Sequence, residues 1–577
     1  MSSPESWIDE VSSSSLGEVN AGIAQWVRVT GTEDERKAFD YIADVLQGYG
    51  LETTLHLPTC LVSNPVSGKL AVGDSDFPCI THSFSTSTGA SGVAGKLVYA
   101  GSGGDAELGA AEAKGKIILT DGLASPQKAR AATLAGVRAL ICISGEHLHE
   151  MTVSPVWGSP TLDSLASLPQ VPVVSVDAEV GGKLKELAGE GTSRARVTTD
   201  VDTRWRQIPV LVADLDVADR EYIMFSGHVD SWHYGAMDNG SANATMIEVA
   251  RILAGHRDDL RRGVRFAFWS GHSQARYAGS TWFADAYWFD LRDNCIAHVN
   301  VDSTGGQGAT DLTTANTMAE TFGFAGDVIR RQTGQELVYQ RFGRAGDQSF
   351  WGVGLPAIFM SVSHQGTPAD VTADLVRLTG GTSARGGGLG WWWHTTEDTL
   401  DKIDADLLVR DTKIYVEVVG RLAVEPVVPF DLGGPINEML SELDTCVSEW
   451  SAAGSLAEDD RLGFDAVRGE LESARDAWNT VRDRIEQGGV SDDDAGALSS
   501  AIVRAAKQLM PANYTATGEF DHDPALGAKT LPTLHPPVEI AAMTDDQLWA
   551  SIHKVRRAIN GVRYRVRLAK QELEAAG

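Results

Sequence analysis

The hydrophobic pattern is clearest in the middle of the chain. From about residue 198 to residue 426, short apolar runs alternate with polar loops and with segments of helical period. The strand candidates are Glu221–Gly227, Arg261–Trp269, Cys295–Asp302 and Leu355–Ser361, and a helix candidate runs from Ser241 to Ala254. Repeated strand–loop–helix units predict an α/β fold, with a mostly parallel mixed sheet sandwiched by helices.

The N-terminal residues are expected to belong to the same α/β domain. Thr32 and Glu35 form a candidate capping box at the start of a helix. Apolar residues then recur at helical spacing until Gly48, at Phe39, Ile42, Val45 and Leu46. The predicted α/β domain therefore comprises residues 1–62 and 198–427.

The segment between these two pieces, residues 63–197, has a different texture. It is rich in Gly, Ala, Val and Ser, and short β-rich pieces alternate with turns. These pieces are GKLVYAGSG, GKIILTDG and ALICIS, with a helical AATLAGVRA before the last of them. The segment resembles the protease-associated domain, a small β-rich insert found in several peptidase families; the alternative is another α/β lobe.

Strand patterns disappear in the last part of the chain, residues 428–577. The final segment carries apolar residues at alternating steps of three and four, at Ile552, Val555, Ile559, Val562, Val566, Ala569 and Leu573. This spacing predicts a helix that packs lengthwise on another helix. The same segment is rich in Lys and Arg, and we interpret these charges as partners of neighbouring carboxylates. The C-terminal part is thus predicted to be a helical domain.

Charge and composition exclude several classes of partner. The formal net charge is −29, which disfavours nucleic acid and anionic membranes as partners because like charges repel. The five cysteines are widely spaced without a CxxC pair, so we expect reduced thiols. The polar N-terminus has no secretory pattern, and no apolar run approaches the ~20 residues of a membrane span. A cytoplasmic protein is expected.

Polar clusters follow the predicted strands of the α/β domain. They are GHVDSW with His228 and Asp230, GAMDNGSAN with Asp238, VNVDSTGG with Asp302, GRAGDQSF with Asp347, and GWWWHTTEDT with His394. Ligands of parallel sheets gather at the carboxyl ends of strands. Each cluster alone has a plain structural interpretation, as a helix cap or a turn. Together, two His and two Asp at successive strand ends suit zinc or a similar divalent ion.

These motifs resemble a known family. GHVDSWHYGAMDNGSAN, VNVDSTG, GDQSFWGVGLPAI and HTTEDTLDKID are similar, in order, to motifs of the di-zinc aminopeptidases, in the branch with glutamate carboxypeptidase and the transferrin receptor. The resemblance implies that His228 and Asp302 hold one zinc ion, that Asp238 bridges, and that His394 holds a second ion. It also implies a homodimer formed through the helical domain. Asp230 and Asp398 are placed to support the imidazoles of His228 and His394 from behind.

One motif departs from the family. After the strand RFAFW the family carries a Glu-Glu pair, a general base and a metal ligand, whereas this chain has SGHSQARYAGS. Neither alignment of the loop places a carboxylate there; His272, Ser273 and Gln274 fall on those positions. His272 is therefore a candidate metal ligand first and a candidate general base second. If His272 is a ligand, Asp347 becomes the candidate proton acceptor. These candidate ligands could hold one zinc ion, two zinc ions or another divalent metal.

The predicted function is hydrolysis of an amide bond in a small peptide or another amide, by a zinc-dependent peptidase or amidase. The candidate substrate-binding residues flank the polar clusters and are Arg276, Tyr277, Arg341, Arg344 and Trp393. The rival hypothesis is an inactive binding or assembly module of the transferrin-receptor type. A single-zinc transferase of the glutaminyl-cyclase type is a third hypothesis, disfavoured because those relatives lack the insert and the helical tail.

Overall fold

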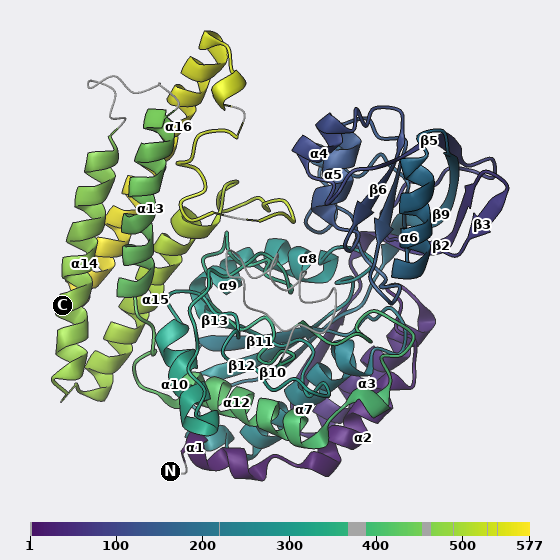
Figure 1. Ribbon diagram of the computed structural model, residues 1–577. Helices are drawn as coiled ribbons and strands as arrows, with labels where there is room; N and C mark the ends of the chain where they lie inside the picture. The colour runs from purple at the N-terminus through teal and green to yellow at the C-terminus, as the bar shows by residue number, and fades with distance from the viewer. Residues whose placement is uncertain are drawn as a thin grey trace.

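The computed structural model describes residues 3–217, 220–366, 388–452, 463–488, 490–527, 529–538 and 540–577. Figure 1 shows three parts: a central sheet with helices on both faces, a second β-rich part, and a bundle of long helices on the opposite side. The predicted α/β domain also includes residues 367–387, which lie outside the described residues.

The central sheet has six strands in the order β1-β10-β12-β11-β13-β14. Their bounds are Glu52–His56 (β1), Val210–Leu215 (β10), Gly263–Trp269 (β12), Tyr222–His228 (β11), Cys295–Asn300 (β13) and Ala357–Ile358 (β14). The three pairs that involve β11, β13 and β14 are parallel, and the pairs of β10 with β1 and β12 are antiparallel. The sheet is mixed, as predicted. In its register His228 pairs with Trp269, so β11 and β12 end side by side.

Helices cover both faces because the strands are apolar on both sides. One face, with Phe225 and Phe266, packs in one core with α2 (Ser13–Ala24), α3 (Glu33–Gly48), α7 (Ala242–Gly255) and α12 (Ala405–Val424). The other face, with Met224 and Trp269, packs against α8 (Ala278–Ala286) and α9 (Trp288–Asn294). Figure 1 shows these two layers. The short α1 (Pro4–Trp7) and α10 (Phe322–Thr333) complete the helical layer on the α12 side.

The predicted helix after Thr32 forms, but its capping box is incomplete. The Thr32 hydroxyl accepts from the Glu35 amide as an N-cap should. The Glu35 carboxylate does not return to Thr32; it accepts from the Gly31 amide at 2.7 Å and from the Ser270 hydroxyl. Glu35 is fully buried. Its carboxylate therefore anchors the start of the loop that follows β12.

The second sheet has eight strands in the order β3-β2-β9-β5-β6-β7-β8-β4. Their bounds are Thr59–Val72 (β2), Ser75–Phe77 (β3), Ile80–Thr81 (β4), Val93–Tyr99 (β5), Ile117–Asp121 (β6), Ala139–Ile143 (β7), Val173–Val176 (β8) and Arg194–Gln207 (β9). The predicted insert boundaries at 63 and 197 fall inside β2 and β9. These long strands pair from Thr59↔Gln207 to Val72↔Ala195 and connect the two parts continuously.

Three helices accompany this sheet: α4 (Asp105–Ala110), α5 (Pro126–Leu134) and α6 (Ala178–Gly189). The helix predicted over AATLAGVRA lies earlier than expected, as α5. Ser125 caps its start with Pro126 at the first turn, and Gly136, with φ +66°, follows its end. The caps decide the bounds of this helix.

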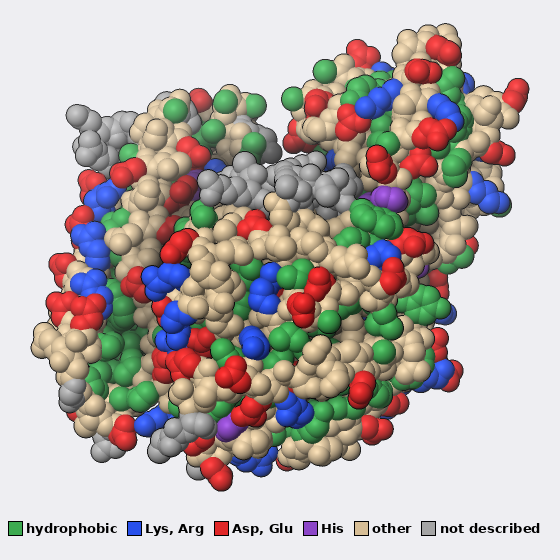
Figure 2. All heavy atoms as spheres, turned by 60° about the horizontal axis from the view of Figure 1, so that its bottom comes forward, with side chains coloured by type: hydrophobic (Ala, Val, Ile, Leu, Met, Phe, Trp, Pro, Cys, Tyr) green, Lys and Arg blue, Asp and Glu red, His purple; other side chains and the backbone are tan. Residues whose placement is uncertain are grey.

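The C-terminal part is helical, with α13 (Gly433–Ala452), α14 (Phe464–Glu486), α15 (Asp492–Tyr514) and α16 (Asp545–Ala576). The buried residues of α16 are the seven apolar positions predicted from the spacing. Its basic residues pair with carboxylates as expected, Arg563 and Arg567 with Glu470 and Arg565 with Glu519. On the face shown in Figure 2, acidic and basic side chains are interspersed. None of the described helices is both long and apolar enough to span a membrane.

Candidate metal centre

Four predicted ligands converge at the carboxyl ends of the central strands. His228 is the last residue of β11, Asp302 follows β13, and Asp238 lies in the irregular turn Ala236–Ser241 before α7. His228 Nε2 lies 3.0 Å from Asp238 Oδ1 and 3.6 Å from Asp302 Oδ2. His394 Nε2 lies 3.0 Å from Asp238 Oδ2. Asp238 thus presents one oxygen to each imidazole, as expected of a carboxylate between two sites.

The imidazoles are oriented from behind by backbone carbonyls. His228 Nδ1 lies 2.9 Å from the Asp230 carbonyl oxygen, and His394 Nδ1 lies 2.6 Å from the Glu150 carbonyl oxygen. A carbonyl can only accept, so each Nδ1 carries a proton, and in the neutral imidazole each Nε2 keeps its lone pair. Both lone pairs are directed at the Asp238 carboxylate, which suits metal ligation.

Two atoms at the centre of this cluster are buried without a hydrogen-bond partner. They are His228 Nε2 and Asp238 Oδ1, the same pair that lies 3.0 Å apart. An unsatisfied buried polar atom costs about 1–3 kcal/mol, so such a pair requires an explanation. Two electron-pair donors at this separation fit a shared cation. The residues present therefore fit a divalent metal ion.

Charge in the cluster also favours a cation. Burial opposes ionisation of Asp238, yet His228 and His394 hold the pKa of this carboxyl well below its usual value. Burial likewise opposes charge on His228, but Asp238 and Asp302 raise the pKa of this imidazole well above its usual value. The carboxylates therefore stabilise positive charge between them.

His272 lies at this cluster despite the missing Glu pair. His228, His272 and Asp302 each offer a ligand atom, and these atoms lie within 4.8 Å of one another. The His272 ring stacks on His228 at a centroid distance of 3.8 Å. Its Nδ1 lies 2.7 Å from Asp347 Oδ2. Burial alone would raise the pKa of the Asp347 carboxyl, but the neighbouring His272 has the larger effect, so this pKa is lowered. An ionised Asp347 fixes the tautomer and leaves His272 Nε2 available as a ligand or a base.

Gln274 and Ser273, the other two residues at the Glu-Glu positions, make hydrogen bonds within the protein. The Gln274 side-chain oxygen accepts from the Thr30 amide at 3.0 Å and from its hydroxyl at 2.6 Å, and its nitrogen donates to the Ser231 carbonyl at 3.1 Å. The Ser273 amide donates to Asp230 Oδ2 at 2.8 Å. Of the three residues at the Glu-Glu positions, only His272 belongs to the cluster of described ligand atoms.

Asp230 supports the His228 imidazole as predicted, but through its backbone carbonyl and not through its carboxylate. Its carboxylate lies 3.8 Å from His228 Nδ1 and accepts instead from the amides of His272 (3.1 Å) and Ser273 (2.8 Å). The Thr30 hydroxyl donates to the same carboxylate at 3.1 Å. The carboxylate binds the adjacent amides of this tight loop, so only the Asp230 carbonyl remains to accept from the His228 imidazole. Asp230 therefore shapes the loop that carries His272.

The prediction that Asp398 supports His394 is wrong. The Asp398 carboxylate accepts from the amides of Met237 (2.8 Å) and Asp238 (3.0 Å), and burial raises its pKa to about 7. It thereby fixes the backbone of the bridging residue. His394 is held instead by Glu150, on a loop of the second sheet. Nothing in the order of motifs could have indicated this contact, because Glu150 is remote from them in sequence.

Comparison with known families places this cluster in context. Residues 211–419 match the model of Peptidase family M28. Residues 211–419 are called the M28 domain below, after this match. This domain contains all four converging ligands and His272. The resemblance to zinc-dependent metallopeptidases is therefore confirmed.

Curated relatives of the M28 domain match parts of the chain. Aminopeptidase NAALADL1 of Mus musculus is 33% identical over 85 residues, 14% of this chain and 11% of that protein. Aminopeptidase YwaD of Bacillus subtilis (strain 168) is 27% identical over 263 residues, 45% of this chain and 54% of that protein. The chain thus spans about a tenth of the length of NAALADL1 and about half of the length of YwaD.

A solved structure shares the fold. An aminopeptidase from Aneurinibacillus sp. strain AM-1 matches with a TM-score of 0.54 and 22% identity, and covers 73% of this chain and 96% of its own. BSAP, a zinc aminopeptidase from Bacillus subtilis, matches with a TM-score of 0.53 and 21% identity, over 72% of this chain and 95% of its own. The predicted α/β fold class is confirmed.

Three of the predicted substrate-binding residues gather beside the metal centre of the M28 domain. The His272 ring meets Tyr277 edge-on at 4.7 Å, and the Arg276 guanidinium lies over the Tyr277 ring at 4.8 Å. Trp157, from a loop of the second sheet, packs on Tyr277 at 4.2 Å, and Arg344 lies 4.3 Å over Trp157. We did not predict Trp157, because no pattern marks a loop residue of another domain.

Arg341 and Trp393 do not form an open pocket with these residues. Arg341 donates to Glu438 at 3.0 Å and to the Asn513 carbonyl at 2.8 Å, which ties it to the helical part. Trp393 is 6% exposed and stacks on His394 at 3.4 Å, so its ring covers a ligand. The structure gives both residues structural partners that sequence spacing did not reveal.

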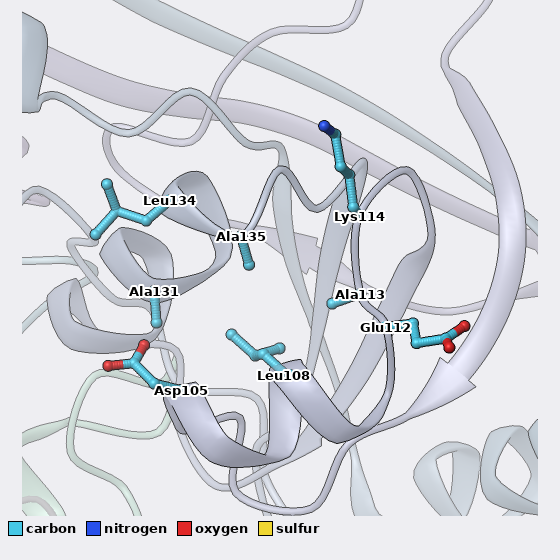
Figure 3. A pocket seen from close by; sticks show the side chains of 9 residues that line it. Asp105, Leu108, Glu112, Ala113, Lys114, Ala131, Leu134 and Ala135 are labelled. Atoms are coloured by element: carbon cyan, nitrogen blue, oxygen red, sulfur yellow. The ribbon is translucent and has the colours of Figure 1, made fainter. Parts of the chain in front are cut away.

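A hollow of about 380 Å³ lies apart from the residues of this centre, and Figure 3 shows the side chains that line it. It lies between α4 and α5 and is lined by Leu108, Ala131, Leu134 and their neighbours. It contains none of the predicted site residues and no His or Cys. It is a gap between two short helices.

Proposed function

We propose that this protein is a metal-dependent hydrolase that cleaves a peptide or amide bond, with one or two zinc ions as cofactor. The observation that carries the proposal is the buried, unpartnered pair His228 Nε2 and Asp238 Oδ1, 3.0 Å apart at the meeting point of four ligand-type side chains. The M28 domain and the aminopeptidase names of its relatives support peptides as the substrate class.

His228, Asp238, Asp302 and His394 would hold the metal. A divalent metal there would supply Lewis acidity, which lowers the pKa of water and polarises a carbonyl group. Among the described residues, no second carboxylate joins Asp238 and His394 to replace the missing Glu. A second ion at His394 is therefore expected to bind more weakly than one at His228 and Asp302.

His272 would manage the proton in this hydrolysis. Asp347 holds its Nδ1 at 2.7 Å, so the free Nε2 faces the cluster and can take a proton from the attacking water. The paired carboxylate stabilises the imidazolium that results and orients the ring for delivery to the leaving amine. Asp230 holds the loop that carries this imidazole in place.

A direct test combines metal analysis with a substrate screen. Purified protein should contain zinc and hydrolyse members of a panel of aminoacyl and N-acyl amides, with loss of turnover in chelator and recovery with Zn²⁺. Asp238→Asn should lose both metal and turnover, while the exposed Asp200→Asn should keep both. Protein without metal and without chelator-sensitive turnover would instead favour the inactive binding module.

The proposal extends to the domains of the chain, its oligomeric state and its location. The second sheet is proposed to be a protease-associated insert, supported by its position between two pieces of the α/β part and its β-rich composition. The helical part is proposed to form a homodimer, which sedimentation would test. The cytoplasmic location and the expectation of no nucleic-acid or membrane partner stay predictions from composition.

A further inference from the structure

A buried arginine lies behind the loop that joins two of the metal ligands. This loop, residues 229–235, runs from His228 to the turn that carries Asp238. Arg28 follows α2 in the N-terminal part of the chain and is fully buried. Its guanidinium group donates to three carbonyl oxygens of the loop, those of Val229 (2.7 Å), Tyr234 (2.6 Å) and Gly235 (2.9 Å). One side chain therefore fixes both ends of the loop.

The middle of the loop is joined to Arg28 through the backbone. The Ser231 amide donates to the Arg28 carbonyl at 2.9 Å, and the Arg28 amide donates to the Ser231 hydroxyl oxygen at 3.2 Å. The guanidinium group also donates to two carbonyl oxygens of its own segment, those of Ile23 (3.3 Å) and Trp26 (3.1 Å). A displacement of residues 229–235 would leave buried donors of Arg28 unpaired, which is unfavourable.

The charge of Arg28 also suits the surroundings of the metal centre. Burial lowers the pKa of Arg28 to about 10, so the guanidinium group keeps its charge near neutral pH. Four carboxylates oppose the effect of burial on this pKa, in decreasing order those of Asp398, Asp230, Asp238 and Glu35. Arg28 therefore supplies a fixed positive charge behind a group of carboxylates.

The packing around the guanidinium group connects it to the turn of the bridging ligand. Gly235 has φ +53°, and a Cβ atom there would lie 3.1 Å from Arg28 Nη2 and 2.2 Å from the Asp238 carbonyl oxygen. The Gly235 carbonyl also accepts from the Gly240 amide at 3.0 Å, across the turn that carries Asp238. The oxygen that Arg28 binds therefore also closes this turn. On its other side the turn is held by the Asp398 carboxylate.

We propose that Arg28 is a positioning residue of the metal centre: by fixing residues 229–235, it sets the separation of His228 and Asp238 that a shared metal ion requires. This inference rests on the proposed metal-dependent function, because it concerns how the same site is preorganised. Arg28 lies outside residues 211–419, so the M28 domain needs the N-terminal segment to complete its metal centre. A lysine cannot replace this side chain, since one ammonium group cannot span the separated carbonyl oxygens that the guanidinium fork reaches.

Zinc affinity of the full chain tests this inference, with Arg262 as the matched control. Arg262 lies just before β12, whereas the loop of His272 follows the other end of this strand. It is 4% exposed and likewise donates to carbonyl oxygens, those of Leu422 (3.0 Å), Glu425 (2.7 Å) and Pro426 (3.2 Å). Arg28→Lys should weaken zinc binding about 10- to 100-fold, as loss of support behind metal ligands typically does. Arg262→Lys should leave it unchanged, even where its melting temperature falls as far.

Two further measurements report the geometry of the site without turnover. The visible absorption of bound Co²⁺ depends on ligand geometry, so it should change in Arg28→Lys and keep its wild-type form in Arg262→Lys. Hydrogen exchange of the metal-free protein follows the amides of Ser231 and Gly240, whose acceptors are the carbonyls of Arg28 and Gly235. Both amides should be protected in the wild type and exchange faster in Arg28→Lys.

The outcomes separate this role from general stability and from the proposed function. Zinc binding that weakens equally in Arg28→Lys and Arg262→Lys, or stays at the wild-type level in Arg28→Lys, would overturn the positioning role.

Wild-type exchange decides the question if Arg28→Lys does not fold. Rapid exchange of Ser231 and Gly240 that slows only after zinc is added would mean that the metal orders the loop, and would refute the role of Arg28. Protection without zinc supports it. If the wild type binds no zinc, the proposed function fails, whereas faster exchange in Arg28→Lys than in Arg262→Lys still shows that Arg28 fixes the loop, and equal exchange refutes it.

Discussion

At the scale of single residues, the metal centre depends on which atom of each side chain is left free. Backbone carbonyls take Nδ1 of His228 and His394, and the Asp347 carboxylate takes Nδ1 of His272. Each imidazole therefore presents Nε2 to the centre. His272 differs from the other two in having a carboxylate behind it in place of a carbonyl, and a carboxylate can stabilise the imidazolium that forms when His272 takes a proton.

Replacing His272 separates its two possible roles. His272→Ala should lower turnover by at least about 100-fold, because proton transfer typically contributes 10²–10⁴-fold. If His272 is a ligand, bound metal should fall as well, measured by elemental analysis after dialysis. Unchanged metal with lost turnover would assign the base role, and unchanged turnover would remove His272 from the mechanism. The exposed His553→Ala is the matched control.

A buried carboxyl far from the centre should make stability depend on pH. Glu320 is fully buried with both oxygens unpartnered, and burial raises its pKa from 4.5 to about 8. Between these values the unfolded chain loses the proton and the folded chain keeps it, so stability falls as pH rises through this window. Glu438 adds to this shift, and Arg341 opposes it.

Glu320→Gln should remove this dependence. The variant should gain on the order of a few kcal/mol relative to the wild type between pH 5 and pH 8, measured by urea unfolding at both values. The exposed Glu186→Gln on α6 should show no such gain. An equal effect of Glu320→Gln at both pH values would contradict the assignment.

At the scale of elements, the strands and helices are positioned by hydrophobic period and by their caps. The seven buried residues of α16 follow from the spacing of three and four, because a seam of this period must face a neighbouring helix. The bounds of α5 were wrong because Ser125, Pro126 and Gly136 determine its ends more strongly than its apolar pattern does. Local signals determine these features, so the sequence contains them.

The seam of α16 should dominate the stability of the helical part. Ile559 is 2% exposed on this helix, and Tyr564 is 65% exposed. Ile559→Ala should cost about 2–4 kcal/mol through lost burial and a residual cavity. Tyr564→Ala should cost less than about 1 kcal/mol. Denaturant unfolding followed by far-UV circular dichroism measures both, and equal costs would contradict the packing of α16 described here.

At the scale of the whole molecule, all three parts of the chain meet beside the metal centre. The Gly158 amide donates to the Arg276 carbonyl at 2.6 Å, and the Trp157 indole donates to the Ser349 hydroxyl at 2.9 Å. The Ala525 amide, from the C-terminal part, donates to the Pro155 carbonyl at 2.8 Å. The loop around Trp157 thus links the second sheet, the M28 domain and the helical part. In Figure 1 the second sheet and the helical bundle lie on opposite sides of the central sheet.

Removing the indole of Trp157 should therefore impair substrate binding without loss of metal. Trp157→Ala is expected to lower kcat/KM about 10- to 100-fold, mainly through KM, because the indole packs on Tyr277, which contacts the His272 ring. Elemental analysis should show wild-type metal content. Leu162→Ala, 93% exposed on the same loop region, should behave as the wild type. Loss of metal in Trp157→Ala would show that the loop supports the centre itself.

The sequence alone determined four of the six strands of the central sheet, β11 to β14, the types of ligand that follow its strands, and the seam of the last helix. These features depend on local period and on chain order, which a linear pattern records. Only the tertiary structure decided that Glu150 holds His394, that Asp398 holds the backbone of Asp238, and that Trp157 separates two arginines. These partners come from segments more than a hundred residues apart, and packing between such segments leaves no periodic trace in the chain.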